Sequence, residues 1–436
     1  MQLARNAQPL QRGICDAIAE RNDIAGQSLR DQWNQLIIRP MSNLSGDSCP
    51  SSYIIVIDAL DECLDERDDD SHIQIILQLL AEARSLKMVQ LRVFLTSRPE
   101  IPIRHGFCQM SKAEHQDFVL HNISPSIVDH DIYIFLGYNL ELIRQKGFLD
   151  NGWPGEQSIK RLVYNASGLF IWAATACRFV SQGKKRKVIR TRLSTVLQSS
   201  CSITEPAKHL NEIYITVLSH SIPATCSDEE KLGLFGMLRH VLGSIVILLS
   251  PLSTKSLSGL LDIPKEDIDE TLEDLHAILD IPNDDTHVLR LHHPSFRDFL
   301  LDKDRCDDLN FWVDQKQAHQ MLADSCIQLL LTTLKEDICS VGKPGTLSTD
   351  IESSRVEDCL PPEVQYACLY WVLHLQKSGA QLRDNDQIHQ FLQKHTLHWL
   401  EALGWMQKIS EGILAIILLE SIALVSLCVA YQKSLN

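Results

Sequence analysis

The chain has 436 residues, 44% of them hydrophobic, and a formal net charge of -15 at pH 7. This length exceeds what one hydrophobic core usually fills, so we expect about two or three domains. The negative charge argues against nucleic acid or an anionic membrane as a general partner. The 13 cysteines form no CxxC pair and no cationic, apolar signal opens the chain, so we expect reduced thiols and a cytoplasmic location.

Residues 1–38 are predicted to form two helices, because apolar residues recur on one face of each, and a polar loop at 42–52 follows. A phosphate-binding P-loop requires the pattern G-x-x-x-x-G-K-[ST] between a strand and a helix, since its main-chain amides and its Lys bind the phosphates. That pattern occurs nowhere in the chain.

An apolar, mostly β-branched run at residues 53–57 predicts a short strand that is buried on both faces, as in a parallel sheet. Three carboxylates, Asp58, Asp61 and Glu62, follow at its carboxyl end, where an open α/β sheet binds its ligand. Burying acids is costly unless a cation or donors compensate, so the cluster indicates a magnesium–nucleotide site. The alternative is a strand that runs into a solvated acidic turn.

A second buried strand is predicted at residues 91–95, and it ends in Thr96, Ser97 and Arg98. Two hydroxyls and a guanidinium are the donors that a terminal phosphate would meet at a strand's end. Residues 73–86 carry apolar side chains at helical spacing and supply the crossover of a right-handed βαβ unit.

These two stretches resemble the motifs of a known family. Residues 58–62, Asp-Ala-Leu-Asp-Glu, with the strand before them, resemble the Walker B motif of NACHT-type STAND nucleotide-binding proteins. Residues 96–99, Thr-Ser-Arg-Pro, resemble the sensor motif of the same proteins. The residues of both motifs are most similar to those of the nephrocystin-like NACHT proteins abundant in fungi.

The resemblance implies hydrolysis of ATP or GTP with Mg2+. Asp58 would hold the metal through water, and Asp61 or Glu62 would be catalytic by orienting the attacking water. Thr96, Ser97 and Arg98 would bind the nucleotide, with Arg98 sensing the γ-phosphate. The family's P-loop lies upstream of the two helices at 1–38, so we expect this chain to begin after it and hydrolysis to be impaired or absent.

Residues 116–120 are a candidate further strand of the sheet. Helices predicted at 127–144 and 159–180 resemble the helical subdomain that follows the sheet in NACHT proteins, and we expect Phe170 and Trp172 to pack in its core.

A basic run begins with Lys184-Lys185-Arg186-Lys187 and continues to Arg190 and Arg192. Such a run is a nuclear localisation signal, an anion-binding patch or the solvent-exposed start of a helix. We favour the solvated helix start, because no aromatic side chain interleaves the cations.

From residue 257, two short helices, a strand at 287–292 and a third helix predict a winged-helix domain, a fold that often binds DNA. The second helix would repel phosphates, because it carries six acids against Lys265. Those acids are Glu266, Asp267, Asp269, Glu270, Glu273 and Asp274.

Residues 293–300, His-Pro-Ser-Phe-Arg-Asp-Phe-Leu, resemble the end of the NACHT winged-helix domain. The resemblance implies that His293 contacts the bound diphosphate. The alternative for His293 is a helix cap or a structural hydrogen bond.

Residues 314–408 predict a helical region with Trp371, Trp399 and Trp405 in its core. The apolar segment 413–430 has about a membrane-spanning length and one acid, Glu420. We favour a buried helix over a membrane span, because the flanks lack an aromatic belt and the family has a buried linking helix here before a C-terminal repeat domain. No 20 to 50 residue repeat occurs, so we expect the chain to end before that domain.

We therefore predict an α/β plus mostly α fold, in which a partial P-loop NTPase parallel sheet precedes helical domains. The predicted divisions are a partial nucleotide-binding domain at 1–122, a helical subdomain at 123–200, a winged-helix domain at 201–305 and a helical arm or linker at 306–436.

The expected function is that of a fragment of a NACHT-type STAND switch in innate-immunity-like signal transduction, with other proteins as partners. In the family, bound diphosphate holds the domains closed, and triphosphate with a signal opens them for self-association or assembly with full-length relatives. The alternative is a non-catalytic interaction scaffold or a decoy partner of those relatives. A winged-helix regulator is disfavoured by the acidity.

Overall fold

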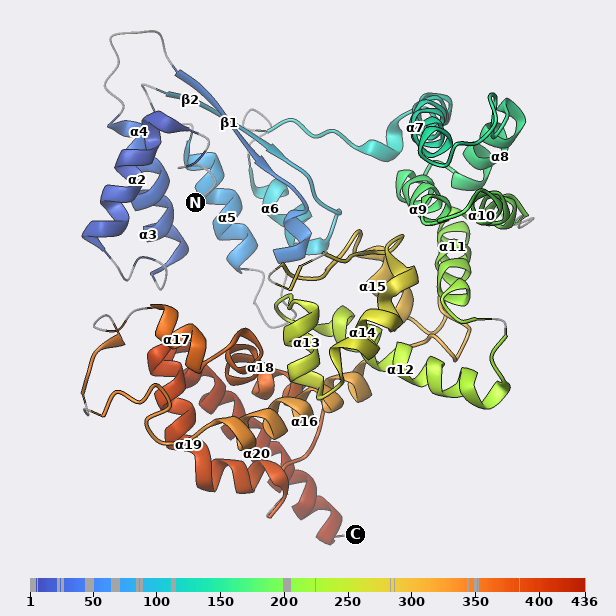
Figure 1. Ribbon diagram of the computed structural model, residues 1–436. Helices are drawn as coiled ribbons and strands as arrows, with labels where there is room; N and C mark the ends of the chain where they lie inside the picture. Colours follow the sequence, from blue (N-terminus) through green and yellow to red (C-terminus); the bar gives the residue numbers. More distant parts are fainter. Residues whose placement is uncertain are drawn as a thin grey trace. The chain divides into compact units, whose positions relative to one another are not determined.

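The computed structural model describes residues 5, 7–21, 24, 27–43, 51–63, 71–83, 86, 89–110, 115–198, 205–223, 225–282, 284–285, 287–342, 345–348, 351, 353–383 and 385–435. The chain divides into two compact units, Met1–Asn122 and Ile123–Asn436. Helices dominate, and the first unit also holds a small parallel sheet, which agrees with the predicted mixture of α/β and helical structure (Figure 1).

The first unit is built around two parallel strands, β1 (Ser51–Ile57) and β2 (Val89–Leu95). They pair in register from Ser51 opposite Val89 to Ile57 opposite Leu95, and α5 (Ser71–Glu82) connects them. The predicted order of strand, helix and strand is therefore confirmed (Figure 1). Because both strands run in the same direction, their carboxyl ends meet at one edge of the sheet.

The prediction that β1 is buried on both faces was wrong. Ile54, Val56 and Phe94 point to one face of the sheet and remain 68%, 65% and 61% exposed. The opposite face is half-buried: Tyr53 packs against buried residues of the N-terminal helices, and Ile57 against buried residues of α5 and the helix after β2. An apolar run gives the same sequence pattern whether one face or two are covered, and here the described helices cover only one.

Helices complete the first unit. They are α2 (Gln8–Glu20), α3 (Leu29–Trp33), a π-helical stretch (Asn34–Ile38), α4 (Arg39–Ser42), a 3-10 turn (Leu60–Cys63) and α6 (Ile101–Gln109). The first four correspond to the two helices predicted over 1–38, and Leu10, Ile14 and Met41 form a small buried core there.

The strand predicted at residues 116–120 does not form. Residues 115–119 have no regular structure, and Leu120–Asn122 is a single 3-10 turn. Phe118 and Leu120 are 77% and 71% exposed. A strand needs a neighbour that pairs with its main chain, and in the described part of the chain β1 and β2 bond only to each other.

The second unit begins with five helices: α7 (Pro125–Lys146), α8 (Glu156–Ala166), α9 (Phe170–Ser181), α10 (Arg186–Gln198) and α11 (Pro206–His220). Trp172 is buried as predicted, and its indole N–H donates to the main-chain oxygen of His209 at 3.1 Å. The same prediction was wrong for Phe170, which is 44% exposed. Phe170 is the first residue of α9, and its ring meets that of the partly buried Phe135 edge to face.

Short elements follow. They are α12 (Asp228–Ile247), α13 (Thr254–Leu261), α14 (Lys265–Leu272), a 3-10 turn (Glu273–Leu275), β3 (Leu279–Asp280), β4 (Arg290–Leu291) and α15 (Ser295–Leu301). β3 and β4 pair antiparallel, so the strand predicted at 287–292 is reduced to two residues. The helices expected around it are present, and the winged-helix assignment stays a prediction.

The last part of the second unit is helical: α16 (Gln315–Thr333), α17 (Ser353–Cys359), α18 (Pro362–Ser378), α19 (Gln387–Trp405) and α20 (Ile409–Leu435). Trp371 and Trp399 are fully buried and meet edge to face, as core packing requires, whereas Trp405 is half-buried.

A chain of buried hydrogen bonds joins α16 to α18. His319 Nδ1 lies 2.7 Å from His374 Nδ1, and His374 Nε2 lies 2.7 Å from the hydroxyl of Tyr366. That hydroxyl accepts from the N–H of Leu249 at 3.1 Å. These hydrogen bonds are compatible with two neutral imidazoles if all of them run in one direction. Tyr366 then donates to Nε2 of His374, and Nδ1–H of His374 donates to Nδ1 of His319.

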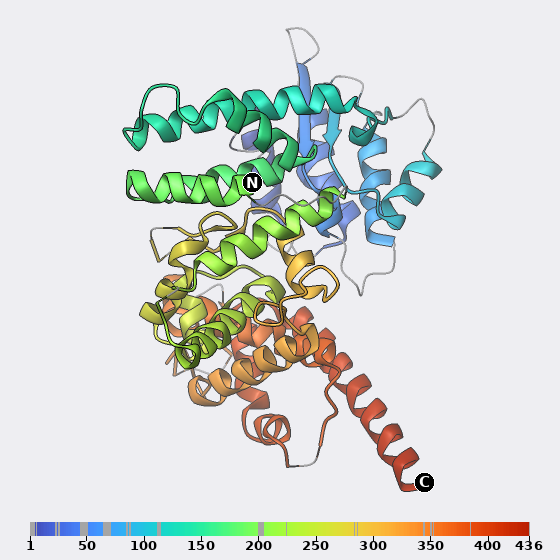
Figure 2. The ribbon, with the colours of Figure 1, turned by 90° about the vertical axis from the view of Figure 1, so that its right-hand side faces the viewer.

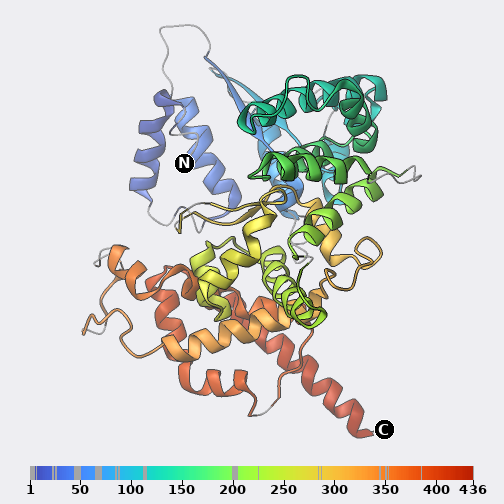
Figure 3. The same ribbon diagram turned by 45° about the vertical axis from the view of Figure 1, so that its right-hand side comes forward.

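α20 buries one face and exposes another. Ala415, Leu419 and Ile422 are buried, whereas Ile413 and Ile417 are 55% and 57% exposed. Glu420, the one acid of this segment, is exposed. Figures 2 and 3 show the C-terminal part of α20 extending past the other helices of its unit. Among the residues that the structure describes, no helix has the length and apolarity that a membrane crossing needs.

Candidate functional site

The parallel register brings the two predicted motifs together at one end of the sheet. Residues 58–62 follow β1 and residues 96–98 follow β2. The N–H of Thr96 donates to the oxygen of Ile57 at 2.9 Å, and the N–H of Leu60 donates back to the oxygen of Thr96 at 3.0 Å. The two turns are therefore joined through their main chains.

Thr96 also positions Asp58. Its hydroxyl donates to Asp58 Oδ1 and accepts from the N–H of Ala59 at 2.9 Å. Ala59 has a φ of 52°, in the left-handed region that residues with a side chain rarely adopt. The strained turn and the hydroxyl hold the exposed Asp58 carboxylate at the strand's end.

Asp61 is engaged by Arg98. The N–H of Arg98 donates to Asp61 Oδ1 at 2.9 Å, and Arg98 Nε lies 3.5 Å from Asp61 Oδ2. The Asp61 side chain is only 11% exposed, whereas that of Arg98 is 40% exposed. Glu62 is exposed, and no described residue forms an ion pair with it. Of the two predicted catalytic carboxylates, Glu62 is thus the more exposed.

Ser97 is half-buried, and its hydroxyl donates to the main-chain oxygen of Arg98 at 2.8 Å. This bond shapes the turn and leaves the hydroxyl oxygen as an acceptor. Within the described residues, no group of three or more His, Cys, Asp or Glu gathers to hold a metal ion. Magnesium sites commonly use one or two carboxylates and take their other ligands from water and phosphates, so the donor set at Asp58 fits that ion.

His293 belongs to the second unit, at the start of α15. Its Nδ1 accepts from the N–H of Ser295 at 3.1 Å and lies 2.7 Å from the Ser295 hydroxyl, which in turn lies 2.8 Å from the hydroxyl of Tyr214. Burial raises the pKa of Tyr214. The hydrogen bonds match the structural alternative for His293 and assign its proton to Nε2. Its contact with a diphosphate stays a prediction.

Sequence reasoning missed two features of this region. The sequence predicts that the Thr96 hydroxyl binds the nucleotide, whereas in the structure it donates to Asp58 Oδ1. A cavity of about 280 Å3 also borders the end of β1. Its lining residues are Leu29, Gln32, Trp33, Leu36, Ile37, Ile57, Ile76, Leu79 and Leu80.

Comparison with known proteins agrees with these motifs. Residues 1–98 match the family model described as nephrocystin 3, N-terminal. Vegetative incompatibility protein HET-E-1 of Podospora anserina is 25% identical over 393 residues, which cover 84% of this chain and 26% of that protein. Both similarities support the predicted resemblance to NACHT-type proteins.

The part of this NACHT-like chain that matches the nephrocystin model contains Asp58, Asp61, Glu62 and the residues from Thr96 to Arg98, whereas His293 lies outside it. The chain spans about a quarter of the length of HET-E-1. The likeness therefore supports the resemblance, and the activity of a whole relative does not transfer with it.

Proposed function

We propose that this chain forms part of a NACHT-type signalling switch whose nucleotide site lies at the carboxyl end of β1 and β2. The observation that carries the proposal is the joined pair of turns, in which Thr96 bonds Asp58 and Asp61 bonds Arg98. One sheet edge thereby presents a carboxylate for a magnesium ion and a guanidinium for a phosphate.

Each residue has a specific role in this proposal. Asp58 holds Mg2+ through water, and the ion neutralises phosphate charge when bound. Arg98 contacts the terminal phosphate through the part of its guanidinium that faces solvent. Glu62 orients water, because Asp61 already accepts a hydrogen bond from the N–H of Arg98 and forms an ion pair with its guanidinium. Thr96 and Ser97 keep the turns in place.

Hydrolysis by the 436-residue chain is proposed to be negligible. The pattern G-x-x-x-x-G-K-[ST] is missing from the sequence, and its amides and Lys supply most phosphate contacts in P-loop enzymes. One arginine and the carboxylates cannot replace that cradle, because acids repel phosphate rather than bind it.

Binding of a fluorescent ATP or GTP analogue in the presence of Mg2+ tests the site. We expect weak binding that is lost in Asp58→Ala and in Arg98→Ala, and no measurable phosphate release. Asp129→Ala removes an exposed carboxylate from α7 and serves as the matched control. Phosphate release that disappears in Asp58→Ala would contradict the proposed loss of hydrolysis, and equal binding by all variants would contradict the site.

The second candidate function is a non-catalytic interaction scaffold, with copies of this chain or full-length relatives as partners. Its support is the exposed apolar face formed by Ile54, Val56 and Phe94. Three such side chains on one face make a larger apolar surface than the single exposed hydrophobic residues that are normal on proteins. The name of HET-E-1, a vegetative incompatibility protein, is compatible with either candidate in an immunity-like response. Absence of nucleotide binding together with capture of a full-length relative would favour the scaffold.

A further inference from the structure

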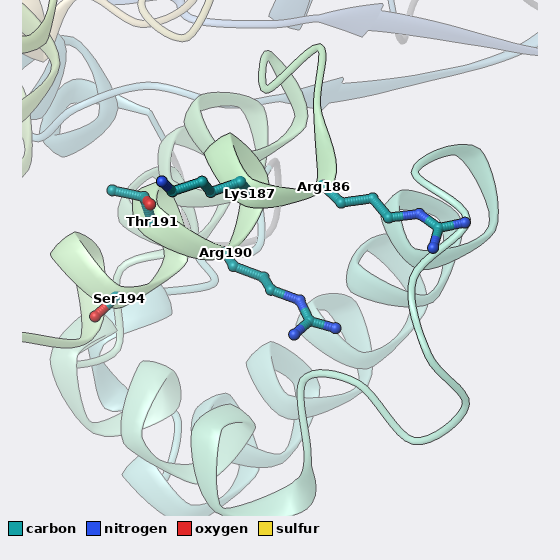
Figure 4. Close-up of a pocket in the computed structure, with 5 residues that line it drawn as sticks. All are labelled: Arg186, Lys187, Arg190, Thr191 and Ser194. Carbon is teal, nitrogen blue, oxygen red and sulfur yellow. The ribbon is translucent and has the colours of Figure 1, made fainter.

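A basic surface lies on α10, in the second unit. Arg186, Lys187, Arg190, Thr191 and Ser194 line a concavity of about 560 Å3 (Figure 4). All five side chains are exposed. In Figure 4, Arg186 and Arg190 extend to the same side of the helix, and Lys187 lies beside Thr191. The concavity is therefore lined by three cations and two hydroxyls.

The helix positions this surface through its opposite face. Ile189, Leu193 and Val196 are buried in the core of the second unit. Because residues three and four apart share a face of a helix, burying these positions turns Lys187, Thr191 and Ser194 outward as one row. The row and the two arginines are thus held by a packed element rather than by a loop.

Carboxylates of the chain already neutralise part of the basic run. Lys184 pairs with Glu273 at 2.9 Å, the buried Arg192 pairs with Asp274 at 2.8 Å, and Arg190 pairs with Asp150. In the described part of the chain no carboxylate forms an ion pair with Arg186 or Lys187. Arg186 and Lys187 are therefore open to an outside anion, although the chain as a whole has a net charge of -15.

We propose that this surface binds a small molecule that carries two or more clustered phosphate groups. Guanidinium forks and hydroxyls match phosphate oxygens, and the lining offers no carboxylate acceptor. The lining also has no aromatic side chain on which a base would stack, which disfavours single-stranded nucleic acid. The same chemistry occurs in free polyphosphates and in phosphorylated lipid headgroups.

Titration with tripolyphosphate in the absence of Mg2+ tests the proposal on the full chain by calorimetry. The double variant Arg186→Glu and Lys187→Glu should bind about tenfold more weakly or worse, since each lost charge contact changes the affinity by about that factor. Lys335→Glu makes the same kind of charge change at an exposed residue after α16 and should bind like the parent chain. Circular dichroism checks that each variant is folded.

Asp150→Asn supplies a test of opposite sign. It releases Arg190 from its ion pair and removes a negative charge beside the concavity, so tripolyphosphate should bind several-fold more tightly. No detectable binding by the parent chain, or equal affinities of the double variant and Lys335→Glu, would overturn the proposal. So would a preference for duplex DNA over tripolyphosphate.

Vesicles distinguish the two sources of the ligand. Sedimentation with neutral vesicles that contain phosphatidylinositol bisphosphate identifies a headgroup as the ligand if the chain co-sediments and Arg186→Glu with Lys187→Glu does not. Binding of tripolyphosphate without co-sedimentation identifies a free polyphosphate. Either result supports the site, whereas co-sedimentation that the double variant retains would contradict it.

Discussion

Arg98 is bound to Asp61 through both its main chain and its side chain. Its N–H donates to Oδ1 at 2.9 Å, and its Nε lies 3.5 Å from Oδ2. The guanidinium is partly exposed, so water screens the ion pair, which contributes about 0 to 1 kcal/mol. The main-chain hydrogen bond to the mostly buried carboxylate is the stronger link between the two turns.

This difference predicts the effects of two substitutions on stability. Asp61→Ala should lower the free energy of unfolding by about 1 to 3 kcal/mol, because it leaves the N–H of Arg98 without its acceptor. Arg98→Ala keeps that N–H bonded and should cost less than about 1 kcal/mol. Urea unfolding of the full chain measures both values. Glu62→Ala, at an exposed acid, should change little, and a larger loss in Arg98→Ala than in Asp61→Ala would refute this ranking.

Stability of the second unit should fall in mild acid. Burial lowers the pKa of His240 and of His292 below the ordinary value of 6.5. In the unfolded chain both side chains take up protons near that value, so below it the unfolded state binds more protons than the folded state. Their contribution is therefore present above about pH 6.5 and is lost as the pH falls toward the lower folded values.

Thermal unfolding at several pH values measures this loss. His240→Gln should reduce the dependence on pH between about 7.5 and 5.5. His130→Gln, at an exposed histidine on α7, should leave it unchanged. Identical pH profiles for His240→Gln and the parent chain would show that burial of this imidazole is not linked to stability.

Duplex DNA should not bind to this protein at physiological salt. The single cation of α14, Lys265, lies 2.6 Å from Asp269 and 3.2 Å from Asp285, so it is already neutralised. The six acids around it repel phosphates, and phosphate neutralisation supplies most non-specific affinity for DNA. A gel shift at sub-micromolar protein that weakens with salt and survives Arg186→Glu with Lys187→Glu would contradict this prediction.

Self-association should depend on the exposed side of α20. Ile413, Ile417 and Leu424 are more than half exposed and recur along one stripe of the helix, so a second copy would bury them. Ile413→Lys with Ile417→Lys should reduce the concentration dependence of sedimentation and change stability by less than about 1 kcal/mol, as at other surface sites. Leu419→Ala, on the buried side, should instead cost about 2 to 4 kcal/mol.

The sequence predicted the strands and their ligand-binding end because each signal is local. An apolar run that ends at Asp58 specifies a strand and its polar turn without reference to any neighbour. The exposure of Ile54 and Phe94 depends on which elements cover the sheet, and no local pattern records that. The same reason applies to residues 116–120, which have strand composition but find no partner strand among the described residues. The Thr96 bond to Asp58 links residues 38 positions apart and appears only when the register of β1 and β2 is known.

The bond between His319 and His374 fixes how α16 and α18 align. Sliding one helix along the other by a single turn moves its side chains by about 5.4 Å, which would separate the two rings and leave polar nitrogens among apolar neighbours. A purely apolar seam tolerates such a shift more easily, as buried polar residues in coiled coils illustrate. The imidazole pair therefore specifies one alignment of the two helices along their axes.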